Sequence, residues 1–207
     1  YYVLNNSYLQ FKIGEHFTWR STLGIKWNYW REDYFSPRKG SYQEKTNSAK
    51  ATTLQTQDLL TEHTLTYTLK KEVHSFSALG GFTAQKGYDK GLSTEVSNFA
   101  NDITGFYDLN SAQLKNSVKS GYHNWGYMSW LGRINYSYDN RYLLTAVARY
   151  DGSSRFSPGN KWAFFPSVSV GWRITEEDFM KSQQIVNDLK LRLSYGRVGN
   201  QAIDIYS

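Results

Sequence analysis

The stretch that decides the fold is Phe17–Tyr29, FTWRSTLGIKWNY, in which apolar and polar residues alternate almost without interruption. A period of two places the two sets on opposite faces of a pleated strand, whereas a helix would mix them. At about 3.3 Å per residue, this strand is longer than a typical globular one and matches a tilted strand that crosses a bilayer. The apolar set is Phe17, Trp19, Leu23, Ile25, Trp27 and Tyr29, and the polar set is Thr18, Arg20, Thr22, Lys26 and Asn28.

The same alternation recurs along the rest of the chain and predicts seven further strands. These strands are expected at Ser7–Ile13, Leu59–Leu69, His74–Gln85, Trp125–Tyr138, Arg141–Asp151, Trp162–Ile174 and Asp188–Val198. The predicted fold class is therefore all-β, with about eight antiparallel strands that form a segment of a transmembrane β-barrel.

The composition agrees with half-buried strands. Aromatic residues make up 17% of the 207 residues although the mean hydropathy is only −0.62. No run of about 18 apolar residues is present, so the sequence predicts no transmembrane helix. The net charge is +6, but the Lys and Arg residues are scattered along the chain and form no basic stripe, which argues against nucleic-acid binding. The lack of cysteine excludes disulfides and thiolate metal sites.

The expected connections alternate between tight turns and long excursions, as in outer-membrane barrels, where short turns are periplasmic and long loops extracellular. The predicted turns are Gly14–His16, Lys70–Glu72 and Asp139–Asn140, the last with residues that tolerate left-handed backbone geometry. The predicted loops are Trp30–Asp58, Lys86–Tyr122 and the shorter Gly152–Lys161.

Two local features depart from this rhythm. Thr175–Asn187 falls where a short turn is expected and predicts a small helical turn at the periplasmic rim, with Glu176, Glu177 and Asp178 as a solvated helix start. Pro166 lies inside an expected strand, where it predicts a bulge or a local distortion because it cannot donate a ladder hydrogen bond.

The segment from Trp130 to Gln201 resembles the barrel of the SusC/RagA-like TonB-dependent transporters of Bacteroidetes. The resemblance is carried by RYLL at 141–144, DGSSRF at 151–156, FPSVS at 165–169, SYG at 194–196 and GNQ at 199–201. It implies a 22-stranded barrel, an N-terminal plug, a SusD-like surface lipoprotein as partner, energy supplied through TonB, and a Gram-negative outer membrane as location. The plug and the TonB box are not among these residues, so we expect residues 1–207 to be one partial barrel domain.

The polar faces of the strands supply the first candidate site, because they line the lumen if the apolar faces meet lipid. The lumen-facing candidates are Arg20, Lys26, Arg133, Asn135, Arg149, Arg173, Lys190 and Arg192. The alternative for each is a structural pairing with an acid of a neighbouring strand or of a plug.

The expected outer loops supply the second candidate site, because exposed aromatic rings stack on sugars or cover peptide side chains. These candidates are Tyr34, Phe35, Tyr42, Tyr88, Phe99, Phe106 and Tyr107. Packing of the loops on each other or on a lid protein is the alternative. The expected cargo is an oligosaccharide or a peptide.

The sequence contains no recognisable catalytic, cofactor or metal motif, so we expect a transport protein and not an enzyme. The four histidines are far apart and have no metal-ligand spacing. A complete eight-stranded outer-membrane barrel with a structural or adhesion role is the main alternative, and a soluble all-β binding module is a further one.

Overall fold

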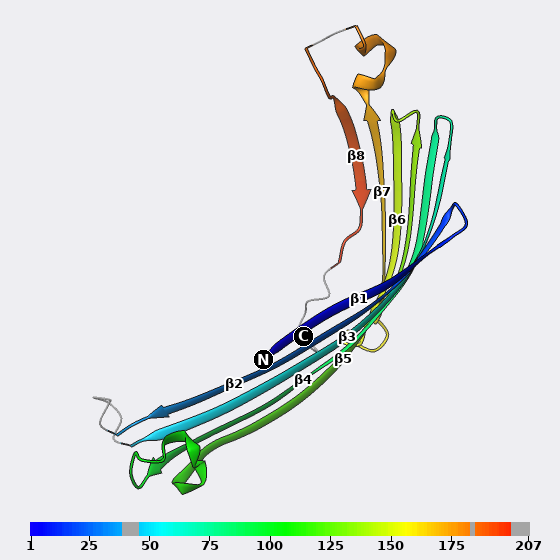
Figure 1. Cartoon of the computed structure of the whole chain (residues 1–207). Coiled ribbons are helices and arrows are strands. Elements are labelled where there is room, and N and C mark those ends of the chain that lie inside the picture. The colour runs from blue at the N-terminus through cyan, green and yellow to red at the C-terminus, as the bar shows by residue number, and fades with distance from the viewer. Residues whose placement is uncertain (39–45, 183–184, 200–207) are drawn as a thin grey trace. The chain divides into compact units, whose positions relative to one another are not determined.

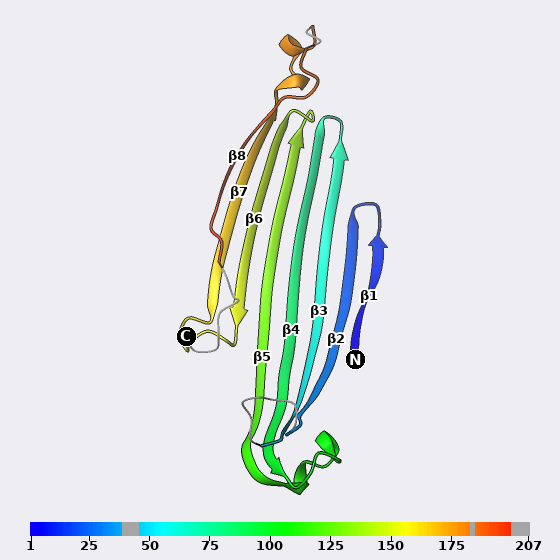
Figure 2. The ribbon, with the colours of Figure 1, turned by 90° about the vertical axis from the view of Figure 1, so that its left-hand side faces the viewer.

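The computed structural model describes residues 1–38, 46–182 and 185–199, which form eight strands in one sheet. The strands pair strictly in chain order, from β1 to β8 (Figures 1 and 2). Their bounds are β1 Tyr2–Ile13, β2 Phe17–Ser36, β3 Ser48–Lys71, β4 His74–Phe99, β5 Ala112–Tyr138, β6 Tyr142–Ser153, β7 Trp162–Arg173 and β8 Lys190–Gly196. All eight predicted strands are confirmed.

The two long loops were predicted too long. β2 continues to Ser36 and β3 begins at Ser48, while β4 continues to Phe99 and β5 begins at Ala112. Most of Trp30–Asp58 and of Lys86–Tyr122 is therefore strand. The reason is that polar side chains occupy both faces here, so the strands carry no apolar alternation; the Thr52 and Ser93 hydroxyls, for example, lie 3.1 Å apart across β3 and β4.

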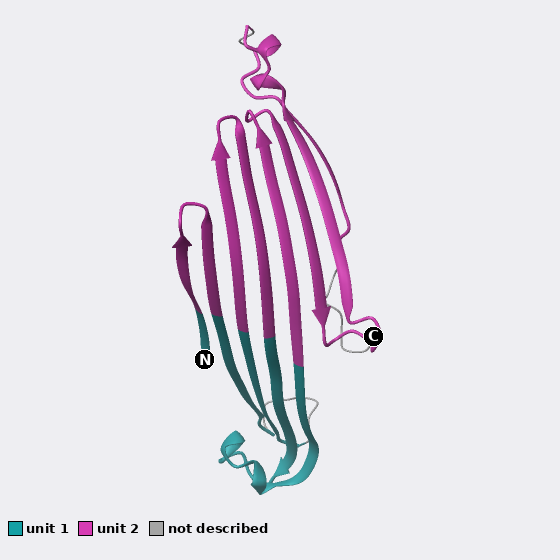
Figure 3. Ribbon diagram, turned by 90° about the vertical axis from the view of Figure 1, so that its right-hand side faces the viewer, with its two compact units in different colours: residues 1–5, 24–59, 86–124 teal, residues 6–23, 60–85, 125–207 magenta. Residues whose placement is uncertain are grey.

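The chain divides into two compact units that are coloured separately in Figure 3. Unit 1 comprises residues 1–5, 24–59 and 86–124, and unit 2 comprises residues 6–23, 60–85 and 125–207.

Unit 2 has one apolar and one polar face, which the register of β5 to β8 assigns residue by residue. Ile134 pairs with Ala146, which pairs with Val168, which pairs with Tyr195. Opposed residues of antiparallel strands point to the same side, so these side chains share one face. The other members of this face, called the apolar face, include Trp130, Tyr138, Tyr142, Leu144, Tyr150, Trp162, Phe164, Val170, Trp172, Leu191 and Leu193.

Aromatic contacts continue the apolar face across the earlier strands of unit 2. Phe82 of β4 lies against Trp130 of β5, with ring centroids 4.6 Å apart, and Trp19 of β2 is stacked on His63 of β3. Much of the apolar face is exposed in the chain alone; Leu193, for instance, is 72% exposed. A continuous exposed apolar face of this kind is suited to lipid contact.

Gly152 explains part of the DGSSRF motif. It pairs with Trp162, whose ring stacks on Tyr150 with centroids 4.9 Å apart. A β-carbon at position 152 would lie 2.7 Å from the Trp162 ring. Only glycine therefore leaves room for this aromatic stack.

The turns in unit 2 use left-handed backbone geometry. Asp139 and Asn140 both have positive φ, at 47° and 53°, which confirms the prediction for this hairpin. Gly14 has a φ of 62°, and Glu72, for which no such geometry was predicted, has a φ of 51°. Residues with left-handed geometry are typical of such short hairpin turns of two or three residues.

Of the bulge or local distortion predicted at Pro166, the bulge is wrong. The β6–β7 register runs without a break from Trp162 to Trp172, and Pro166 pairs with Ala148. The Pro166 carbonyl accepts a hydrogen bond from the Arg197 amide, so the nitrogen of Pro166 also faces the β8 side. Because this nitrogen points away from β6, the missing N–H breaks no bond of the β6–β7 ladder.

Unit 1 contains a small buried cluster. Ala49, Val96, Phe99 and Ala112 are at most 7% exposed, and Phe35, Phe106 and Leu109 pack against them. The cluster lies where β4 and β5 are joined through the short 3₁₀ turns η1 (Gly105–Tyr107) and η2 (Leu109–Ser111). Hydrophobic burial thus fixes a connection that would otherwise be irregular.

The alternative of a closed eight-stranded barrel does not agree with the strand order. β1 and β8 are the two ends of the order and do not pair with each other in the part of the chain that the structure describes. None of the helical turns in that part is long and apolar enough to cross a membrane.

Candidate functional site

The face of unit 2 opposite the apolar face gathers most of the predicted lumen candidates. In the register, Asn135, Thr145, Ser169 and Ser194 follow one another across β5 to β8. The same face carries Arg133, Arg149, Arg173, Lys190 and Arg192. Six of the eight candidates therefore share this polar face; that it lines a lumen remains a prediction.

A hydroxyl-lined hollow lies on this polar face. Arg192 Nε donates to Ser169 Oγ at 2.9 Å, and Ser194 Oγ donates to the same oxygen at 2.9 Å. Thr145 Oγ1 donates to Asn135 Oδ1 at 3.0 Å. The hollow has a volume of about 590 Å³ and is also lined by Arg133. Two guanidinium groups and several hydroxyls together can bind carboxylate, phosphate or polyhydroxylated groups.

The polar face of β5 to β8 carries more positive than negative charge. Arg149 is paired internally, since it contacts Asp151 at 3.3 Å and the Tyr127 hydroxyl at 2.8 Å, while Asp151 also accepts from Ser129. In contrast, Arg133, Arg173 and Lys190 form no ion pair with any residue in the described ranges. The face therefore has unpaired positive charge available to an anionic group.

Arg20 and Lys26 of β2 lie in different units. The Arg20 guanidinium lies 4.0 Å from the centre of the Tyr8 ring in unit 2. Lys26 Nζ lies 3.7 Å from Asp58 Oδ2 in unit 1. Lys26 thus pairs with an acid of a neighbouring strand, as the alternative for it expected, whereas the partner of Arg20 is an aromatic ring.

The prediction that the aromatic candidates lie in loops is wrong for four of the seven. Tyr34 and Phe35 belong to β2, and Tyr88 and Phe99 belong to β4, because the strands extend into the expected loops. Phe106 and Tyr107 lie in η1, as a loop position requires, and Tyr42 lies outside the described residues.

The aromatic candidates also differ in their surroundings. Phe35 and Phe99 meet edge to face with centroids 5.7 Å apart inside the buried cluster, which Phe106 joins. These three are packing residues. Tyr34 and Tyr107 are 59% and 86% exposed, and the Tyr107 ring also packs on Phe106 with centroids 4.3 Å apart.

Asn47 is an important residue that the sequence reasoning missed. Its side chain is fully buried, accepts from the Phe99 amide at 2.7 Å and donates to Asp102 at 2.7 Å. The backbone of Asn47 accepts from Asn98, which has a φ of 64°. An asparagine in a polar stretch carries no periodic signal, so only the fold reveals this role.

Glu177 is a second residue with an unforeseen role. It accepts hydrogen bonds from the Tyr142 hydroxyl at 2.7 Å and from Trp172 Nε1 at 2.9 Å, and it contacts Arg141 at 3.3 Å. These contacts tie the two 3₁₀ turns η3 (Ile174–Glu176) and η4 (Asp178–Met180) to the ends of β6 and β7. The expected small helical turn is thus a pair of 3₁₀ turns.

The contacts of this segment shift two carboxyl groups in the same direction. The hydrogen bonds from Tyr142 and Trp172, together with the Arg141 charge, lower the pKa of Glu177 from its ordinary value. The hydrogen bond and charge of Lys181, assisted by Arg141, lower the pKa of Asp178. Glu177 and Asp178 therefore carry the anchoring contacts of the segment, and among the residues described the acidic triplet forms no metal cluster.

Comparison with known proteins gives the class. The family model described as "TonB dependent receptor-like, beta-barrel" matches residues 2–207. TonB-dependent receptor P26 of Formosa agariphila is 38% identical over 208 residues, which cover 98% of this chain and 21% of the receptor. TonB-dependent receptor SusC of Bacteroides thetaiotaomicron is 54% identical over 76 residues, which cover 37% of this chain and 8% of SusC.

Solved structures show the same fold. The RagAB peptide transporter matches with a TM-score of 0.88 and 22% identity, over 97% of this chain and 23% of that chain. The RagAB peptide importer in its closed-closed state matches with the same TM-score over 99% of this chain.

The eight strands are therefore a segment of a membrane β-barrel wall. The chain belongs to the TonB-dependent receptor β-barrel family, and the predicted resemblance to SusC/RagA-like proteins is confirmed. It spans 21% of the length of P26 and 23% of the matched RagAB chain.

Proposed function

We propose that this chain forms part of the wall of an outer-membrane transporter that imports a large nutrient, an oligosaccharide or a peptide. A SusD-like surface lipoprotein acts as its partner, and TonB supplies energy through a region outside these residues. The lumen lies on the polar face of β5 to β8, and lipid lies against the apolar face.

The observation that carries this proposal is the separation of the two faces of unit 2. A face with Val168, Val170 and Leu193 backs directly onto a face with Arg133, Arg192 and three serines. A soluble sandwich would instead cover its apolar face with a second protein layer. A barrel wall exposes its apolar side to lipid and its polar side to water.

The polar face favours a cargo that carries anionic or amide groups. Arg133 and Arg192 line one hollow with hydroxyl donors, an arrangement that binds the carboxylates and carbonyls of peptides as well as acidic sugars. The structural relatives named as peptide transporters support the peptide alternative.

Uptake by the natural full-length protein tests the proposal. A strain that lacks the gene should lose growth on either peptides or oligosaccharides as the sole nutrient, and the intact gene should restore it. The double variant R133Q/R192Q should restore growth poorly, whereas R31Q, in a residue paired with Asp33, should restore it fully. Normal uptake of both nutrient classes without the gene would contradict the proposal.

A further inference from the structure

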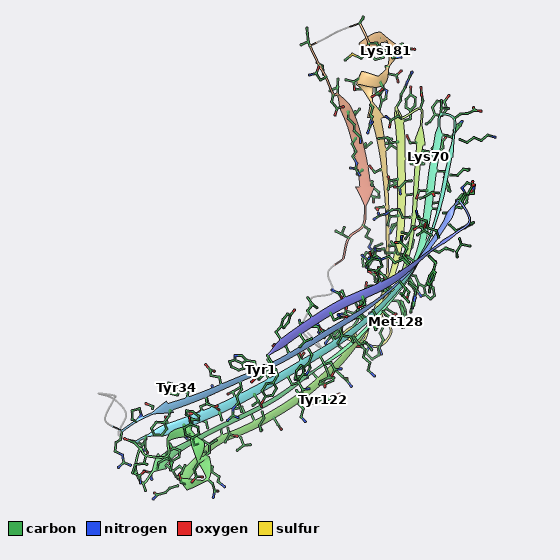
Figure 4. The ribbon with its side chains drawn as sticks, in the orientation of Figure 1. Tyr1, Tyr34, Lys70, Tyr122, Met128 and Lys181 are labelled. Carbon is green, nitrogen blue, oxygen red and sulfur yellow. The ribbon has the colours of Figure 1, made fainter. Side chains whose placement is uncertain are left out.

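A group of tyrosines, amides and lysines in unit 1 lies outside the function described so far. Tyr88 of β4 and Tyr122 of β5 are stacked, with ring centroids 5.8 Å apart and planes inclined by 30°. Gln55 Nε2 donates to the Tyr88 hydroxyl at 3.2 Å, and that hydroxyl donates to Gln57 Oε1 at 2.8 Å. Tyr122 is 60% exposed and projects from β5 (Figure 4).

The alternation along β4 adds two lysines to this group. Lys86, Tyr88 and Lys90 are two residues apart and therefore point to the same side of the strand. No residue from His74 to Ser97 has a positive φ that would interrupt the alternation. We call Gln55, Gln57, Lys86, Tyr88, Lys90 and Tyr122 the tyrosine–lysine surface.

The same alternation tells which side of β4 this surface occupies. Phe76 and Phe82, at even positions of β4, contact Tyr67 and Trp130 on the apolar face of unit 2. The even positions change from Phe82 and Ala84 to Lys86, Tyr88 and Lys90. The side of β4 that meets lipid thus changes within a few residues from apolar to aromatic and basic, as expected where hydrocarbon gives way to headgroups.

The charge on this side of β3 and β4 is uncompensated. From Lys86 to Val96 the even positions of β4 hold Lys86 and Lys90 as their only charged residues, and from Ala49 to Leu59 the odd positions of β3 hold none. The opposite side carries Asp58, Asp89 and Glu95 beside Lys50. Neither Lys86 nor Lys90 forms an ion pair within residues 1–38, 46–182 and 185–199.

We propose that the tyrosine–lysine surface binds the phosphorylated saccharide headgroup of a glycolipid in the outer leaflet of the membrane. The two ammonium groups bind phosphate, the exposed tyrosine face packs on a sugar ring, and the glutamine amides bind sugar hydroxyls. This site lies on the lipid side and not on the cargo side, so it anchors the wall at a fixed depth. The inference rests on the membrane orientation in the proposed function, but it needs no transport.

Binding of a defined glycolipid tests the proposal. The full-length protein in detergent is titrated with micelles of phosphorylated glycolipid or of the same glycolipid after phosphatase treatment. The wild-type protein should bind the phosphorylated lipid about tenfold more tightly, since each lysine near an anionic lipid contributes measurably to binding. Equal binding of the two lipids by the wild-type protein would overturn the proposal without the use of any variant.

Variants then locate the site. K86Q/K90Q should lose most of the preference for the phosphorylated lipid, while K50Q/K119Q, which removes two lysines from the other side of β3 and β5, should keep it. An unchanged preference in K86Q/K90Q, with the β-sheet circular dichroism of the wild type, would overturn the assignment to this surface. Because cargo is absent from the assay, loss of uptake and loss of lipid binding are separate results.

Discussion

The two units use the same strands in different ways. In unit 2 the alternation sorts side chains into an apolar and a polar face, and stability requires an apolar environment on one side. In unit 1 both sides of β3 and β4 are largely polar, and stability comes from a local cluster around Phe99 and Asn47. Strand pairing is thus compatible with lipid or with water, and the side chains on each face decide which of the two that face requires.

The largest expected difference between the units concerns a charge on the lipid side. Val168 is central in β7 and 43% exposed, and Leu92 of β4 is 49% exposed. V168R should destabilise the full-length protein in bilayers by about 3 kcal/mol, because the guanidinium enters the hydrocarbon, whereas L92R should cost less than about 1 kcal/mol. Urea unfolding of the two variants in lipid measures this, and equal losses would contradict the division between the units.

The next effect is on the buried cluster of unit 1. N47A removes the acceptor of the Phe99 amide and the donor to Asp102 inside a fully buried site. We expect the local stability to fall by about 2 kcal/mol. Hydrogen exchange should become faster in residues 96–112 and remain unchanged in β6 and β7. N110A, in an exposed residue of the same connection, is the control and should leave the exchange rates unaltered.

A smaller effect is expected on the segment that Glu177 anchors in unit 2. Because the folded state lowers the pKa of Glu177, its contribution is fully present above the ordinary value of 4.5 and is lost as the pH falls through the lowered pKa. Proteolysis of residues 174–182 should therefore become faster on acidification. E177Q should already be cleaved faster at neutral pH, and the matched variant E176Q should behave as wild type; identical cleavage of both would contradict the anchoring role.

The smallest effect is expected at Lys26. Its ammonium lies 3.7 Å from Asp58 and is 42% exposed, so water screens the pair. K26Q should change the free energy of unfolding by about 0.5 kcal/mol or less. A loss as large as that of V168R in the same urea titration would contradict the comparison, because a water-screened pair of unit 1 would then contribute as much as the lipid side of unit 2.

The number and order of the strands were predictable because half-burial imposes a period of two on the sequence. The prediction was accurate where one side is apolar, as in β6 and β7, and failed where both sides are polar, as in residues 48–58 and 86–99. The shared face of Arg133, Arg149 and Arg192 followed from the same parity. The roles of Asn47 and Glu177 did not, since their partners Phe99 and Tyr142 are 52 and 35 residues away in the sequence.

The strictly sequential strand order has a consequence for how the chain finds its fold. Every strand pairs with the one before it, and the turns at 14–16, 72–73 and 139–141 are only two or three residues long. Each hairpin can therefore zip from its turn outward with little loss of chain entropy, although the final sheet is large. Slow folding steps are expected at two pairings, between β4 and β5 and between β7 and β8. In both, the partner strands are joined by a long connection that contains two 3₁₀ turns and not by a tight hairpin turn.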